Sequence, residues 1–219
     1  MKIRRYLVAG FAGLLAMGMV STGFAAPFQL SLVTPIQIIN ADTPVHGLAI
    51  NLIFGLNSEV VGADIGIINA VSENDAGLML GGINYVAGDV VGLQYGFVNW
   101  VGGNIAGIQE SLINWAAGDI IGGQAGAINL VGGSLNGIQF GLANYIGGDV
   151  GGIQLSAINV AGFMEGSQLG LVNYAVDTTG FQLGAINWTG TLDGLQIGVL
   201  NFATGKEFWK FMPIVNAGW

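Results

Sequence analysis

The chain has no cysteine and very little charge. Only 8% of its 219 residues are charged, against about a quarter in an average soluble protein. The lack of cysteine excludes disulfides, thiolate metal sites and cysteine nucleophiles. Positive charge is especially scarce: the chain has five Lys and Arg and thirteen Asp and Glu. No Lys or Arg occurs between residue 5 and Lys206. Binding of nucleic acid requires clustered Lys and Arg, so nucleic acid is excluded as a partner.

The segment 1–25 has the features of a secretory signal peptide. Three basic residues among the first five precede an uncharged apolar run over residues 6–20. Gly23 and Ala25 then place small residues at the −3 and −1 positions of a cleavage site. We therefore predict cleavage after Ala25, with an uncleaved anchor as the alternative. The mature chain, residues 26–219, would form one domain with a net charge of about −11.

What the chain does have is apolar residues and glycine. Hydrophobic residues make up 52% of it, glycine numbers 39, and no charged residue lies between Asp119 and Asp149. Disordered chains are polar and charged, so this composition excludes disorder. A folded chain of this kind either buries nearly all of its residues or faces lipid.

One short motif, Gln-x-(Gly/Ser)-x-x-Asn, recurs through most of the chain. Looser copies start at Asp64, at Met79 and at Phe211, and Asn51 marks the earliest unit. A nearly constant spacing of about 15 residues, slightly shorter toward the end, indicates a repeat architecture of twelve units without a linker. The eight full copies contain the pairs Gln94 and Asn99, Gln109 and Asn114, Gln124 and Asn129, Gln139 and Asn144, Gln154 and Asn159, Gln168 and Asn173, Gln182 and Asn187, and Gln196 and Asn201.

Within a unit, apolar and polar residues alternate with the period of a β-strand. In residues 92–101, Leu93, Tyr95 and Asn99 fall on one face, and Gln94 and Trp100 fall on the other. Transmembrane helices are a weaker alternative, because every unit contains Gly and Asn. Dipeptides such as Gly103-Asn104 between the apolar runs predict two-residue hairpin turns.

Two all-β architectures can be built from such units. A hairpin at Gly103-Asn104 would pair Trp100 with Gly107 and Val98 with Gln109, which gives an antiparallel up-and-down meander. We expect this meander to close into an outer-membrane-type β-barrel of about 12 strands. The alternative is a parallel β-solenoid with about 15 residues per coil, in which repeated Gln and Asn stack as hydrogen-bonded ladders.

Three observations favour the barrel. The turn residues alternate between acidic and neutral types, as upward and downward strands would. The residue two places before Asn alternates between large and small. The chain also ends on the aromatic Trp219, with further apolar residues at every second position before it, as in outer-membrane barrels. The turn residues are Asp89, Asn104, Asp119, Ser134 and Asp149, and the large and small residues are Leu112, Ala127, Leu142, Ala157, Leu171 and Ala185.

The units "GLQIGVLN", "GFQLGAIN" and "GIQFGLAN" resemble the tandem surface-repeat proteins of bacterial envelopes, whose repeats read Gly-x-Gln-x-Gly-x-x-Asn. The likeness covers Val45–Trp219. It implies a surface protein of the envelope and no particular activity. A partial similarity to curlin repeats is interpreted as convergence on the same ladder chemistry, because curlin units are longer and more polar.

Few residues are candidates for chemistry. The only histidine, His46, occupies the Gln position of the first unit by sequence, and Glu110 interrupts an apolar face. Acids that recur in every second turn could bind calcium, but each turn offers a single carboxylate, so a role in the turns is preferred. The recurrent aromatic residues beside Asn are expected to form an interfacial girdle or to fill gaps opposite glycine. No catalytic set, phosphate loop or metal motif is present, and we predict no enzyme activity and no cofactor.

The resulting hypothesis is an exported outer-membrane barrel with a structural or passive-pore role. Its expected partners are membrane lipid and the outer-membrane assembly machinery, with possible self-association. The alternative is a secreted or surface β-solenoid that acts as an adhesin or forms fibres. Under this alternative, uncapped ends would allow copies to stack end to end.

Overall fold

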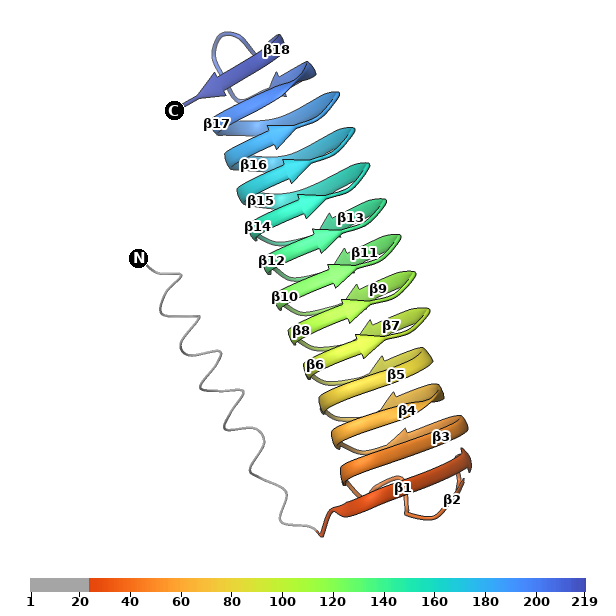
Figure 1. Ribbon diagram of the computed structural model, residues 1–219. Coiled ribbons are helices and arrows are strands. Elements are labelled where there is room, and N and C mark those ends of the chain that lie inside the picture. Colours follow the sequence, from red (N-terminus) through yellow and green to blue (C-terminus); the bar gives the residue numbers. More distant parts are fainter. Residues whose placement is uncertain (1–23) are drawn as a thin grey trace.

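The chain forms a parallel β-solenoid, a stack of coils in which each coil lies directly on the one before it (Figure 1). The structure is a computed structural model that describes residues 24–219, so nearly all of the predicted signal peptide lies outside the described residues. Within that range, no helix is long and apolar enough to cross a bilayer. Eleven coils can be counted, one for each glycine with a positive φ. Equivalent asparagines in adjacent coils are 15 positions apart through most of the stack and 14 positions apart from Asn159 onward.

Each coil contains two short strands. In the fourth coil, β6 (Val90–Tyr95) and β7 (Val98–Val101) are joined by a bend at Gly96 and Phe97, and a turn over residues 102–104 leads to the next coil. Strand β8 (Ile105–Glu110) then pairs in parallel with β6, and β9 (Ile113–Ala116) pairs in parallel with β7. Equivalent residues of successive repeats therefore lie side by side.

The remaining coils follow the same plan. In some of them the strand continues through the bend or the turn, so that two short strands merge into one long strand. The bounds are β3 (Val45–Asn57), β4 (Val60–Val71), β5 (Asp75–Val86), β10 (Ile120–Ala125), β11 (Ile128–Val131), β12 (Leu135–Phe140), β13 (Ala143–Ile146), β14 (Val150–Leu155), β15 (Ile158–Leu169), β16 (Val172–Leu183) and β17 (Ile186–Ala203).

The interior of the solenoid has an apolar half and an amide half. Val90 and Val101 lie next to the turn, in a continuous apolar cluster with their counterparts in other coils. Gln94 and Asn99 lie next to the bend and are fully buried. Between the two halves, each coil has a glycine whose Cβ would collide with the preceding coil. For Gly122 (φ +135°), a Cβ would stand 2.0 Å from the carbonyl oxygen of Gly107.

Both ends of the stack carry strands that differ from the coils. At the start, β1 (Ala26–Val33) pairs in parallel with β3 and in antiparallel with the short β2 (Ile36–Gln37). At the end, β18 (Phe211–Gly218) crosses the last coil and pairs with β17 in antiparallel. The segment from Phe211 that was predicted to be a twelfth repeat is therefore a cap strand, and the C-terminal coil is not open as the fibre hypothesis assumed.

The prediction of a closed antiparallel barrel is wrong, and the alternative solenoid is the fold. No hairpin pairs Trp100 with Gly107; Trp100 instead pairs with Trp115, and Gln94 pairs with Gln109. The error arose from treating each unit as one straight strand. Gln and Asn are five residues apart, so a straight strand puts them on opposite faces, whereas the bend at Gly96 turns both into the interior.

Candidate functional site

Eleven asparagines form a continuous ladder through the stack. Each Nδ2 donates a hydrogen bond to Oδ1 of the asparagine in the next coil, at 2.8–3.2 Å, from Asn51 to Asn201. In most coils the second N–H donates to the backbone carbonyl at the bend of the following coil, as Asn129 does to Phe140 at 2.9 Å. The same carbonyl also accepts the backbone N–H of Gly126 at 3.0 Å, so the asparagine adds a second hydrogen bond to the coil-to-coil pairing at the bend.

Eight glutamines form a second ladder beside the first. Each Nε2 donates to Oε1 of the glutamine in the preceding coil, at 2.7–3.0 Å, from Gln196 down to Gln94. The two ladders therefore donate in opposite directions along the axis, so their amide dipoles oppose each other. The ladders account for all sixteen repeat amides named from the sequence, and all of them are at most 2% exposed.

The first rung of the asparagine ladder comes from an unexpected position. Gly55 occupies the Asn position of the first coil, and the side chain of Asn51, four residues earlier, fills the space where a Cβ of Gly55 would lie. The Gln position of the first coil holds Ala49, which pairs with Asp64. His46 is therefore not in the Gln position; it lies on the outside, with Nε2 3.6 Å from Oε2 of Glu59.

Two carboxyl groups are buried at the N-terminal end of the interior. Asp64 takes the Gln position and accepts a 2.6 Å hydrogen bond from Nδ2 of Asn51. Burial raises the pKa of Asp64 to about 8, with a smaller contribution from the charge of Asp75, and burial raises the pKa of Asp75 to about 7. Within residues 24–219, the Oδ2 atoms of both carboxyls have no hydrogen-bond partner. Both groups are therefore protonated in the folded protein at slightly acidic pH.

The raised pKa values predict that stability falls as pH rises. The unfolded chain releases these protons near the ordinary pKa of 3.8, whereas the folded chain holds them to about 7 and 8. The folded state thus binds more protons between these limits, and the unfolding free energy decreases from about pH 4 to pH 8. We expect thermal melting to show this decrease and the double variant Asp64→Asn/Asp75→Asn to flatten it. An unchanged slope in the double variant would refute the assignment.

The turns between coils carry a third, exposed ladder. From Asn74 to Ser134, the turn side chain accepts a hydrogen bond from the backbone N–H of the equivalent residue in the next coil, as Asp89 does from Asn104 (2.6 Å) and Asp119 from Ser134 (2.7 Å). Stacking places equivalent residues about 4.8 Å apart. Alternation of acidic and neutral residues therefore keeps carboxylates two coils apart, which explains the two-unit period that was taken as support for a barrel.

A change at Ser134 should reveal this charge spacing. Ser134→Asp would place three carboxylates in adjacent coils, and each neighbouring pair would cost about 1 kcal/mol in low salt. We expect a lower melting temperature at low ionic strength and recovery near 1 M salt, where screening is strong. The neutral variant Ser134→Asn should melt like the parent at both salt concentrations. A salt-independent loss in Ser134→Asp would show that packing, and not charge, is responsible.

The outside of the coils is mostly apolar. The column that precedes the ladder asparagines is aliphatic, and the column that follows them is rich in rings, of which Trp100 and Trp188 are exposed and Trp115 is half-buried. Trp100 and Trp115 stack with centroids 5.2 Å apart, and Trp188 stacks on Phe202 at 4.9 Å. The aromatic residues thus form a stripe along the second strands. They do not fill gaps opposite glycine, which was one of the two roles expected from the sequence.

The other residues singled out from the sequence, Glu110 and Trp219, lie on the surface. Glu110 lies on the outer face of β8, between Tyr95 and Ala125 in its column. Across the described part of the chain, no three His, Asp or Glu side chains are grouped to hold a metal ion. Trp219 is fully exposed beyond β18.

Comparisons with protein-family models, with curated proteins and with solved structures gave no match. The structure itself shows a tandem-repeat protein with stacked Asn and Gln ladders. Sequence reasoning missed the interior glycine column, although glycine stands two residues before every repeat glutamine. It also missed Asp75, which replaces an interior valine.

Proposed function

We propose that this chain is an exported, non-enzymatic structural protein of the cell surface, related to the envelope surface-repeat proteins that its motif resembles. The main support is the use of its polar side chains. The repeated amides, which would be the obvious candidates for binding or chemistry, are buried and bonded to one another from coil to coil. They hold the solenoid together and present nothing to a substrate.

The C-terminal end of the solenoid favours lateral adhesion over fibre formation. The cap strand β18 pairs with the last coil in antiparallel, which interrupts the parallel order that a stacked copy would continue. It also contains Pro213, which has no N–H to offer a further strand. Lys206 donates hydrogen bonds to Asn216 and to the carbonyl of Ala217, which ties the cap to the preceding loop. We therefore propose that the long sides of the solenoid make its contacts.

Processing and surface exposure test this proposal. We expect the protein recovered from its producing cells to begin at Ala26, and protease added to intact cells to digest it. The variant Ala25→Arg, which places a large charged residue at the −1 position, should block cleavage and reduce surface exposure. Recovery of the unprocessed chain from the cytoplasm would contradict the proposal.

A further inference from the structure

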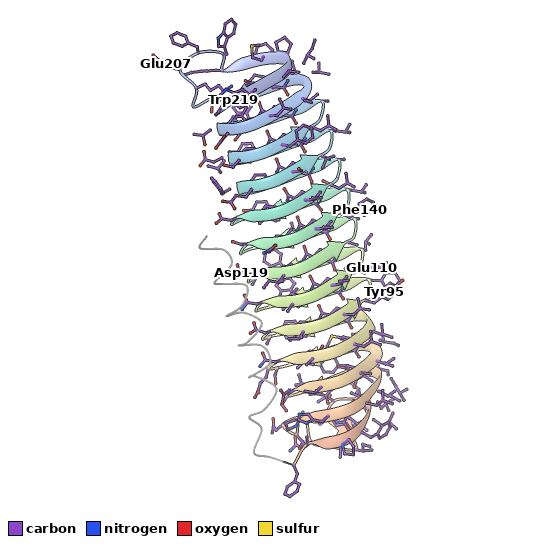
Figure 2. The ribbon with its side chains drawn as sticks, turned by 60° about the vertical axis from the view of Figure 1, so that its left-hand side comes forward. Tyr95, Glu110, Asp119, Phe140, Glu207 and Trp219 are labelled. Carbon is purple, nitrogen blue, oxygen red and sulfur yellow. The ribbon has the colours of Figure 1, made fainter. Side chains whose placement is uncertain are left out.

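The two long edges of the solenoid differ sharply in polarity. The acidic edge is formed by the turns, with Asp89, Asp119 and Asp149 in alternate coils. The apolar edge is formed by the bends, where the outermost residues include Phe97 (72% exposed) and Leu142 (66% exposed). Figure 2 shows Asp119 on the opposite side of the stack from Tyr95 and Phe140, which lie beside the bends.

Polarity changes in steps from the apolar edge to the acidic edge on the outer face that the second strands form. On the second strands, the aliphatic column of Ile113 and Ile128 comes first, then the aromatic column, then the turns. The ring of Tyr145 leans toward the turn, because its hydroxyl lies 3.7 Å from where a Cβ of Gly147 would be. On the first strands, the outer residue nearest the turn is apolar in most of the earlier coils, as with Val91 and Ile121, and polar only in some of the later coils, as with Glu165. The order on the second strands, aliphatic, then Trp and Tyr, then acidic, is the order of groups across a membrane interface.

The backbone at the apolar edge is also compatible with lipid. In hydrocarbon every N–H and C=O must be satisfied within the protein. At the bends, coil-to-coil hydrogen bonds continue, for example from Phe97 to Gly82 (2.9 Å) and from Leu142 to Ala127 (2.9 Å). The interior amides are paired with one another behind this surface, so the edge exposes mostly apolar side chains, with Glu110 as a charged exception.

An open groove follows the C-terminal half of this edge. It has a volume of about 730 Å³, and its floor is formed by small bend residues such as Gly170 and Gly184. Its walls are apolar, and the small members of the large–small alternation, Ala157 and Ala185, widen it on either side of Leu171. Ser156 is the one polar side chain in the lining, and its hydroxyl is hydrogen-bonded to the carbonyl of Ile158, so the groove fits a hydrocarbon chain.

We propose that the solenoid lies along a lipid surface, with its apolar edge immersed in one leaflet and its acidic edge in water. This inference deepens the proposed surface function by naming its partner. The aromatic column lies three residues from the bend, a distance of about 10 Å along the strand. This depth is less than the thickness of the hydrocarbon in one leaflet, which is roughly 15 Å. The apolar surface continues around both sides of the edge. Fluid lipid can cover both sides at once, whereas the flat face of a second copy would cover one side and leave the other in water.

Matched substitutions in one coil test the proposal. Ile121 lies on the first strand beside the acidic edge, and Ile128, 40% exposed, lies on the second strand beside the apolar edge. We expect the protein purified from its producing cells to float with phosphatidylcholine vesicles, whose zwitterionic headgroups minimise repulsion of the acidic chain. Ile128→Glu should weaken partitioning at least 10-fold, and Ile121→Glu less than 3-fold.

A second pair tests the same geometry by removing charge. Glu110 is next to the bend and Glu165 is near the turn. Glu110→Gln should strengthen vesicle binding about 3-fold or more, while Glu165→Gln should leave it unchanged, although both remove one negative charge.

The outcomes separate the possible partners of the apolar edge. A parent chain that does not float, or equal effects within both pairs, would overturn the proposal. Lipid-free oligomers that Ile128→Glu dissociates, without vesicle binding, would identify a second copy as the occupant instead. Neither result affects the processing and surface-exposure test, so the proposed function can stand or fall separately.

Discussion

The substitution Gly122→Ala should destabilise the solenoid severely. Gly122 has φ +135°, which L side chains rarely adopt, and an added Cβ would lie 2.0 Å from the carbonyl oxygen of Gly107. The contact is with backbone, so no side chain can move aside. Strain and overpacking together should cost roughly 3–6 kcal/mol. We expect chemical denaturation to show this loss, or the variant to be recovered unfolded.

Gly151→Ala is the matched control for this substitution. Gly151 faces outward, and the nearest heavy atoms to an added Cβ would be 3.9 Å away. Alanine there should be neutral or stabilise by up to about 1 kcal/mol, because it restricts the unfolded chain. Equal losses in the two variants would contradict the interior placement of the glycine column.

Breaking both ladders in one coil should have an effect of similar size. In Gln139→Ala/Asn144→Ala, Oε1 of Gln124 loses the donor that reaches it from Gln139 at 2.8 Å. An N–H of Gln154 and one of Asn129 lose their acceptors as well. At about 1–3 kcal/mol for each unsatisfied buried group, the loss should be roughly 3–9 kcal/mol, in addition to the cavity.

The exposed Asn136 provides the control for the ladder variant. It lies in the same coil on the outer face, outside the ladders. Asn136→Ala should change the unfolding free energy by less than about 0.5 kcal/mol. If the double variant were equally mild, the amides would not act as paired interior groups.

The repeat itself could be read from the sequence because each coil obeys the same constraints. Gln at 94 and Asn at 99 recur since each must meet its counterpart in the neighbouring coils. The looser units at Asp64 and Met79 were also found, and the strand register aligns them with Gln94. Strand character followed from alternation, which holds within each short strand.

Strand direction could not be read in the same way. The bend at Gly96 reverses the alternation, and a Gly-Asn pair suits a hairpin turn as well as a turn between stacked coils. Charge alternation at Asp119, Ser134 and Asp149 looked like a two-strand period, although it arises from repulsion within a single column. The interior glycines were overlooked because a positive φ leaves no mark in sequence beyond glycine itself.

Disulfide formation between introduced cysteines tests the parallel stack most directly, because the chain has no cysteine of its own. Leu130 and Tyr145 are paired in adjacent coils on the outer face. Parallel neighbours lie about 4.8 Å apart, within the range that a disulfide bridges. Leu130→Cys/Tyr145→Cys should oxidise readily to an intramolecular disulfide while the protein stays folded. In a hairpin around Gly133-Ser134 these residues would be about 25 Å apart, so a folded protein with two free thiols after oxidation would contradict the solenoid.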